Sequence, residues 1–262
     1  MFFNLINILY SCMSLELTDI FTVDKDGKPT IKIVLFGPPL AGKTSMLTVF
    51  SALRRLENPD TIVSSLTKIQ DETGRTVFFD QGVFQTPPFK GKRFDRLRYQ
   101  LWTIPGEDRH KIQREIVMQG ADGVLIFLNF EKTAYEDNKR IIFEAKEFIG
   151  EKFGKKIPVV AFINKADLPP AERMDKRVLI KLLIDSGAIE SDKAANYVIT
   201  GSCLDARNDL LAILTSPNRD QYFENNRLKF EKRPESVWQI VKPIQQLTKF
   251  VVQQRIEYLQ EM

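Results

Sequence analysis

The sequence is poor in the residues that build disulfide frameworks and histidine-based metal sites. Among 262 residues it has two cysteines, Cys12 and Cys203, and one histidine, His110. Two cysteines exclude a disulfide framework and a four-cysteine zinc site, and they fit a reducing compartment. A single histidine argues against a histidine-based metal site. The 43% of hydrophobic residues is enough for a core that needs neither metals nor disulfides.

Charge and hydropathy also lack the extremes that mark two other classes of protein. The 38 basic and 34 acidic residues leave a formal net charge of +4. Spread over the whole chain, this small excess does not indicate a nucleic-acid-binding protein. No apolar run reaches the roughly 20 residues that a membrane-spanning helix needs. Composition therefore predicts a cytoplasmic protein that does not bind nucleic acid.

Residues 1–30 precede the first regular pattern and are interpreted as an N-terminal arm. Residues 1–14 are rich in Phe, Ile and Leu and contain no Lys or Arg. One interpretation is an amphipathic helix on a membrane surface, which would make the protein peripherally membrane-associated. The alternatives are a packing arm or a start of translation at Met13, and the lack of a basic polar face favours these.

From Ile31 onward, short apolar runs alternate with amphipathic stretches. Near-continuous apolar runs, typical of buried strands in a parallel sheet, lie at Ile31–Phe36, Val124–Phe130, Pro158–Asn164 and, more briefly, Tyr197–Thr200. The helical patterns between them indicate βαβ units and a sheet covered by helices.

Two further runs, Thr76–Phe84 and Leu97–Ile104, have no helical pattern between them. The connection Gln85–Arg96 holds two prolines and a glycine, so we predict an antiparallel pair at the edge of the sheet. Together the patterns predict one α/β domain over residues 31–262, with a mostly parallel six-stranded sheet flanked by helices. A polar insertion at about 215–235 precedes a final helix at 236–260, which Pro243 should kink.

Residues 37–44 read G-P-P-L-A-G-K-T and match the phosphate-loop pattern G-x-x-x-x-G-K-[ST] between a strand and a helix. Backbone N–H groups of such a loop hold phosphate oxygens at the helix N-terminus. Lys43 adds a positive charge, and Thr44 supplies a magnesium ligand. A chance match is the alternative, and the flanking strand and helix argue against it. The predicted nucleotide-binding residues of this segment are Gly37, Leu40, Ala41, Gly42, Lys43, Thr44 and Ser45.

A second motif, Asn-Lys-Ala-Asp at residues 164–167, follows an apolar strand and distinguishes guanine from adenine. Asp167 offers two carboxylate oxygens to N1–H and N2–H₂ of guanine, a donor pair that adenine does not have. The alternative is a turn that starts a helix and is capped by Asp167. We therefore predict that Asn164, Lys165 and Asp167 bind a guanine nucleotide.

With these two motifs, the chain from residue 31 to about 214 and the final helix resemble the Ras-like small GTPases. Within them the chain looks closest to the MglA-type gliding-motility GTPases, with Arf-like proteins as cousins. The MglA-type switch I run R-T-L-F-F-D reads R-T-V-F-F-D at residues 75–80, and the switch II run T-V-P-G-Q reads T-I-P-G-E at 103–107. The resemblance implies the Ras-like G-domain fold of the P-loop NTPases. It also implies that the chain binds GTP and GDP with Mg²⁺ and acts as a molecular switch.

The resemblance also implies roles for individual residues. Thr76 would join Thr44 as a magnesium ligand, Arg75 would be an intrinsic arginine finger, and Gly106 would donate its N–H to the γ-phosphate. The run at residues 200–204 resembles the last guanine-contacting loop, with a backbone N–H near Cys203 meeting guanine O6. Its implied nucleotide-binding residues are Ser202, Cys203 and Leu204. The implied partners are a regulatory protein of roadblock type and an effector that the sequence does not name.

Two positions depart from the common Ras-like pattern. Thr103 stands where many Ras-like proteins have an aspartate, as it also does in MglA-type proteins, so the outer magnesium carboxylate is missing there. Asp80 on the neighbouring strand is a candidate substitute. Glu107 replaces the glutamine that orients the attacking water, and an ionised glutamate accepts hydrogen bonds but donates none.

These departures leave more than one function open. The main hypothesis is a switch with slow intrinsic GTP hydrolysis, and Glu107 makes a non-hydrolysing GTP-binding scaffold the alternative. A P-loop kinase is a third hypothesis, against which Asp167 and the lack of an arginine-rich lid argue. The basic cluster at residues 90–98 is either a contact for an acidic partner or anionic lipid, or a solvated hairpin tip. His110 is expected on the surface of the helix after switch II, without a role.

Overall fold

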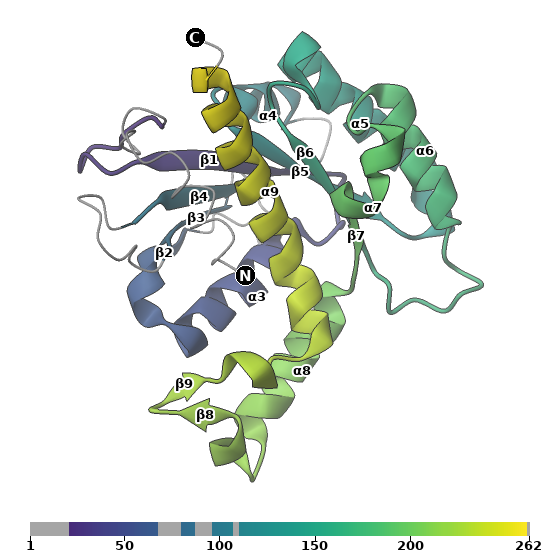
Figure 1. Ribbon diagram of the computed structural model, residues 1–262. Helices are drawn as coiled ribbons and strands as arrows, with labels where there is room; N and C mark the ends of the chain where they lie inside the picture. Colours follow the sequence, from purple (N-terminus) through teal and green to yellow (C-terminus); the bar gives the residue numbers. More distant parts are fainter. Residues whose placement is uncertain (1–20, 68–79, 87–95, 107–109, 261–262) are drawn as a thin grey trace.

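The computed structural model describes residues 21–67, 80–86, 96–106 and 110–260, and a mixed sheet forms their middle layer (Figure 1). Within these residues the sheet has seven strands in the order β2-β3-β4-β1-β5-β6-β7. Neighbours from β4 to β7 pair in parallel, whereas β2–β3 and β3–β4 are antiparallel. The predicted α/β fold with a mostly parallel sheet is confirmed. The strands are β1 Thr30–Phe36, β2 Ile62–Thr67, β3 Asp80–Gln85, β4 Arg98–Thr103, β5 Gly123–Asn129, β6 Val159–Asn164 and β7 Val198–Thr200.

The prediction of six strands was wrong by one, because β2 was not recognised. Its sequence, I-V-S-S-L-T, is mostly polar at its centre, and Val63 is exposed. The pairing of β2 with β3 is irregular, with two register shifts. β2 therefore forms the edge of the sheet, and the predicted antiparallel pair β3–β4 lies one position further in. The part of the predicted strand at residues 76–79 lies outside the described residues.

Helices cover both faces of the sheet (Figure 1). On one face the core is formed with α3, α8 and α9, and on the other with α4, α5 and α6. All residues of β5 and β6 are buried, as their unbroken apolar sequences predict. The helix bounds are α3 Lys43–Glu57, α4 Lys111–Met118, α5 Tyr135–Ile149, α6 Lys176–Ser186, α7 Ala194–Tyr197, α8 Cys203–Thr215 and α9 Glu235–Gln260.

The polar segment between α8 and α9 contains a small hairpin, β8 Phe223–Glu224 and β9 Arg227–Leu228. Asn225 and Asn226 turn the chain with φ of 49° and 61°, as a tight hairpin turn requires. Arg233 fixes the segment to the domain, because its guanidinium lies 4.1 Å from the Trp238 ring and forms an ion pair with Glu57. α9 then continues through Pro243 to Gln260.

Residues 1–20 of the predicted arm, including Met13, lie outside the described residues. The arm is described from Phe21, which is buried, and the N–H of Thr30 donates to the Thr22 carbonyl at 2.8 Å. Among the described residues, no helix has the length and hydropathy needed to cross a membrane.

Candidate functional site

The predicted phosphate loop connects the carboxyl end of β1 to the N-terminus of α3, and its backbone is closely packed. Gly42 has a left-handed φ of 95°, and a Cβ there would lie 2.1 Å from Asn164 Nδ2. Only glycine satisfies both conditions. Leu40 also has a positive φ, 58°, and its side chain is exposed, as is Ser45 after the loop. The loop therefore has the tight, left-handed turn that brings backbone groups to one side.

Lys43 is buried at the start of α3, with 7% of its surface exposed. Its Nζ donates to the carbonyl oxygens of Gly37 and Pro38, each at 2.8 Å. Burial lowers the pKa of Lys43 to about 7, with Arg114 acting in the same direction and Asp80 opposing it. Within the described part of the chain, Lys43 forms no ion pair. An anion bound at this loop would therefore stabilise the charged form of Lys43.

Three oxygen-bearing side chains meet beside Lys43. The Thr44 and Thr103 hydroxyls donate to the same oxygen of Asp80, Oδ2, at 2.6 and 3.1 Å. Asp80 is fully buried and lies opposite Thr103 in the β3–β4 register. Hard oxygen ligands are what Mg²⁺ prefers, and it usually takes one or two of them from a protein in addition to phosphates and water. These three side chains fit such an ion. Asp80, the predicted substitute carboxylate, contacts Thr44, the predicted magnesium ligand.

The segment at 105–106 lies directly against the phosphate loop. A Cβ on Gly106 would come within 2.3 Å of Pro39 N, so the two backbones are in contact. Arg114 of α4 holds this segment, because its Nη1 donates to the Pro105 carbonyl at 3.4 Å. The same buried guanidinium donates to Glu144 Oε1 of α5 at 2.6 Å. The other predicted switch residues, Arg75, Thr76 and Glu107, lie outside the described residues.

Asn164 joins three segments that are distant in sequence. Its Nδ2 donates to the Ala41 carbonyl of the phosphate loop at 2.8 Å, and its Oδ1 accepts the Cys203 N–H at 2.9 Å. The side chain is buried at the carboxyl end of β6. Asn164 was predicted as a nucleotide-binding residue, and the structure shows that it holds the loops of the site together. Sequence alone had no signal for these two contacts beyond its position after a buried strand.

The remaining residues of the second motif and the loop at 202–204 have different surroundings. Asp167 and Leu204 are exposed, whereas Ser202 is buried and caps α8 by accepting the Asp205 N–H at 2.9 Å. Burial raises the pKa of the Cys203 thiol, and the nearby Asp167 carboxylate raises it further. Lys165 has a left-handed φ of 72°, and its Nζ lies 2.8 Å from Glu131 Oε1. Glu131 was not identified from the sequence.

His110 was expected on the surface, and this prediction was wrong. It is 8% exposed, directly before α4. The reason is its helical phase, since Arg114 and Val117 follow it at intervals of four and seven residues and are both buried. Within the described residues, neither ring nitrogen has a hydrogen-bond partner.

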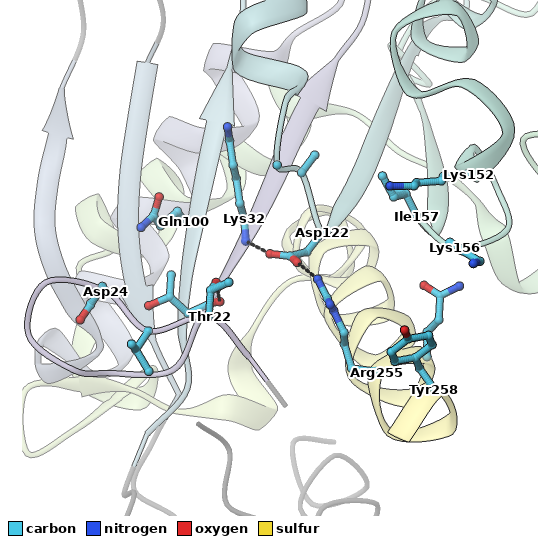
Figure 2. Close-up of a pocket in the computed structure, with 15 residues that line it drawn as sticks. Thr22, Asp24, Lys32, Gln100, Asp122, Lys152, Lys156, Ile157, Arg255 and Tyr258 are labelled. Atoms are coloured by element: carbon cyan, nitrogen blue, oxygen red, sulfur yellow. Dashed lines mark hydrogen bonds and ion pairs between the residues drawn. The ribbon is translucent and has the colours of Figure 1, made fainter. Parts of the chain in front are cut away.

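A cavity of about 710 Å³ lies at the other end of the parallel strands, where they begin (Figure 2). Its central carboxylate, Asp122, accepts the Lys32 N–H at 2.7 Å and pairs with Arg255 of α9 at 2.6 Å. Nearby, Arg98 of the predicted basic cluster is paired with Asp24 at 2.5 Å. These ion pairs fix α9 and the arm to the sheet. The cavity includes none of the predicted site residues.

Comparison with known proteins gives one informative match. No protein-family model matches the chain. The chain is similar to a curated protein of Myxococcus xanthus (strain DK1622), "Mutual gliding-motility protein MglA", with 30% identity over 147 residues. The aligned region is 55% of this chain and 72% of that protein.

Proposed function

The chain belongs to the MglA-type family of small GTPases, and we propose that it binds GTP and GDP with Mg²⁺ and acts as a nucleotide-dependent switch. The observation that carries the proposal is Lys43, a buried cation held by two backbone carbonyls beside the pair of Thr44 and Asp80. A phosphate group would replace those carbonyls as the partner of Lys43. Thr44 and Thr76 would hold the Mg²⁺, with Asp80 orienting the Thr44 hydroxyl. Bound Mg²⁺ would neutralise charge on the phosphates.

Guanine recognition is assigned to Asp167 and the start of α8. Asp167 is exposed and near enough to Cys203 to raise the pKa of its thiol, so it lies close to the start of α8. The Cys203 N–H is engaged by Asn164, which leaves the adjacent N–H of Leu204 for guanine O6. Guanine would thus be bound from two sides, by a carboxylate and by a helix N-terminus.

The experiment that tests this assignment is calorimetric titration of Asp167→Ala with GTP. Loss of the charged hydrogen bonds should weaken binding by about 3 kcal/mol. Asp185→Asn serves as the matched control, because it removes an exposed carboxylate of α6 that pairs with Lys181 and belongs to neither predicted motif. Equal GTP affinity of Asp167→Ala and the unaltered chain would contradict guanine recognition by this residue.

Switching is proposed to work by order and disorder of two segments. The γ-phosphate and Mg²⁺ would hold Thr76 and Gly106, and their loss on hydrolysis would release both. The close contact of Gly106 with the phosphate loop supports this proposal, because it places the segment at 105–106 beside the loop that would hold the phosphates.

Hydrolysis is proposed to be slow and to depend on Arg75 more than on Glu107. Pro39 occupies the loop position nearest the γ-phosphate, where its ring would crowd an arginine supplied by a partner. Arg75 adjoins Thr76 and would enter when switch I is ordered. An arginine finger contributes roughly a 10³–10⁵-fold gain in rate. The second candidate, a non-hydrolysing scaffold, is favoured only by the glutamate at position 107.

Single-turnover hydrolysis distinguishes these two candidates. With a stimulating partner present, Arg75→Ala should lose the stimulated rate, whereas Glu107→Gln should hydrolyse GTP equally fast or faster. An unchanged rate in Arg75→Ala would remove Arg75 from the mechanism. Absence of any hydrolysis by the unaltered chain, with retained GTP binding, would favour the scaffold.

A regulatory partner of roadblock type is proposed to bind at α4. Ile112 and Ile116, one helical turn apart, are 71% and 59% exposed on the helix that follows switch II. Two exposed isoleucines at this spacing form an apolar stripe suited to a partner surface. A pull-down of roadblock-type protein with the GTP-bound chain, compared with an Ile112→Glu/Ile116→Glu variant, tests this proposal.

A further inference from the structure

Glu131, just after β5, is not part of either predicted motif but contacts one of them. We propose that Glu131 is a positioning residue, which holds the Lys165 side chain where it contacts the bound nucleoside. The inference rests on the proposed guanine-nucleotide function. It adds a residue to the site that neither the sequence motifs nor the family comparison identifies.

The direct contact is an ion pair between neighbouring strand ends. Lys165 Nζ lies 2.8 Å from Glu131 Oε1, and their side chains are 24% and 37% exposed. A lysine side chain of this exposure otherwise has many rotamers, and ordering it costs conformational entropy when a ligand binds. The pair with Glu131 orders Lys165 before the nucleotide arrives.

Glu131 is itself held on its other side by Asn129, the last residue of β5. The Asn129 Nδ2 donates to Glu131 Oε2 at 3.1 Å, and the Glu131 N–H donates to Asn129 Oδ1 at 3.1 Å. Asn138, fully buried in α5, in turn fixes the Asn129 backbone through hydrogen bonds of 2.9 and 2.8 Å. A continuous chain of hydrogen bonds therefore runs from α5 to the Lys165 ammonium.

The backbone around Glu131 is tied to the loop that Lys165 begins. The Lys132 N–H donates to the Glu172 carbonyl at 3.0 Å, and the Met174 N–H donates to the Phe130 carbonyl at 2.8 Å. These bonds fix the far end of the loop at 165–174, and at its near end the Phe130 N–H donates to the Asn164 carbonyl at 3.2 Å. Lys165 lies within this loop between Asn164, which contacts the phosphate loop, and Asp167, which is assigned to guanine. An ammonium fixed at this place would keep the Lys165 stem between these two residues, where the nucleoside is proposed to bind.

Dissociation of fluorescent GDP and GTP analogues from the full-length chain tests the proposal. Glu131→Gln should release both analogues roughly two- to fivefold faster, the range expected for a partly exposed ion pair. The factor should be equal for GDP and GTP, because the contact lies at the nucleoside and not at the γ-phosphate. Glu131→Asp should restore part of the loss. Asp185→Asn, which breaks the exposed Lys181–Asp185 pair, should leave the rate unchanged.

A double-mutant cycle with Lys165→Met separates positioning from general structural support. If Glu131 acts through Lys165, Glu131→Gln has no further effect on nucleotide affinity in the Lys165→Met chain. An equal loss in both backgrounds, or unchanged or slower release in Glu131→Gln alone, would overturn the inference while leaving the proposed function intact. Failure of the unaltered chain to bind any guanine nucleotide would overturn both.

Discussion

Two lysines, Lys32 near the start of β1 and Lys43 in the helix that follows it, both have a pKa lowered by burial and differ in how their charge is compensated. Near the start of the strand, Lys32 has Asp122, which opposes the shift and also pairs with Arg255. In the helix after β1, Lys43 donates to two backbone carbonyls, and Asp80, the carboxylate that raises its pKa, accepts from two threonine hydroxyls. The charge of Lys32 is therefore balanced within the protein, whereas Lys43 can pair with an anionic ligand.

Exchange of each lysine for alanine gives the sharpest contrast between the two. Lys43→Ala should abolish GTP binding, because the cation for the β- and γ-phosphates is lost, while circular dichroism remains that of the folded chain. Lys32→Ala should bind GTP as the unaltered chain does. Tight GTP binding by a folded Lys43→Ala chain would show that the loop is not the site, and loss of binding in Lys32→Ala would remove the difference between the two lysines.

The pH dependence of binding should also differ from that of a site with an ordinary lysine. Lys43 has a pKa of about 7 without ligand, and a bound phosphate raises it. Binding therefore takes up a proton above pH 7, and affinity should fall about fivefold between pH 7 and 8 and approach a fall of about tenfold per pH unit above that. Affinity should rise only about twofold more below pH 7, where Lys43 becomes fully protonated without ligand. Calorimetry in buffers of different ionisation enthalpy measures the uptake, and its absence at pH 8 would contradict the assigned pKa.

At the amino-terminal ends of the parallel strands, removal of the Asp122 carboxylate should lower stability and leave nucleotide binding unchanged. Asp122→Ala leaves the partly buried Lys32 N–H without its acceptor and Arg255 without this partner, which should cost about 1–2 kcal/mol of unfolding free energy. Urea unfolding of the nucleotide-bound chain measures the change. A weakened nucleotide affinity with unchanged stability would show that Asp122 is coupled to the nucleotide site.

The sequence predicts the parts of this molecule that depend on local pattern, and misses those that depend on distant contacts. The buried strands β5 and β6 are evident because both of their faces are covered and their sequences are continuously apolar. β2 is not, because an edge strand with serines at its centre lacks that signal. The predicted carboxylate Asp80 of β3 lies beside Thr44 because α3 starts next to the end of the sheet where Asp80 lies. Glu131 was missed because its partner Lys165 is 34 residues away and no motif contains both.

The two hydrogen bonds of Asn164 have a consequence for how the chain acquires its activity. They link the phosphate loop to residues 123 positions further along the chain, and those to the start of α8 another 39 positions on. Contacts of such sequence separation form late, after the cost of closing long loops has been met. A chain interrupted before β7 would contain the complete phosphate-loop motif but would lack the Cys203 N–H that fixes Asn164. Stable nucleotide binding should therefore require that the C-terminal third of the domain has been synthesised and has folded.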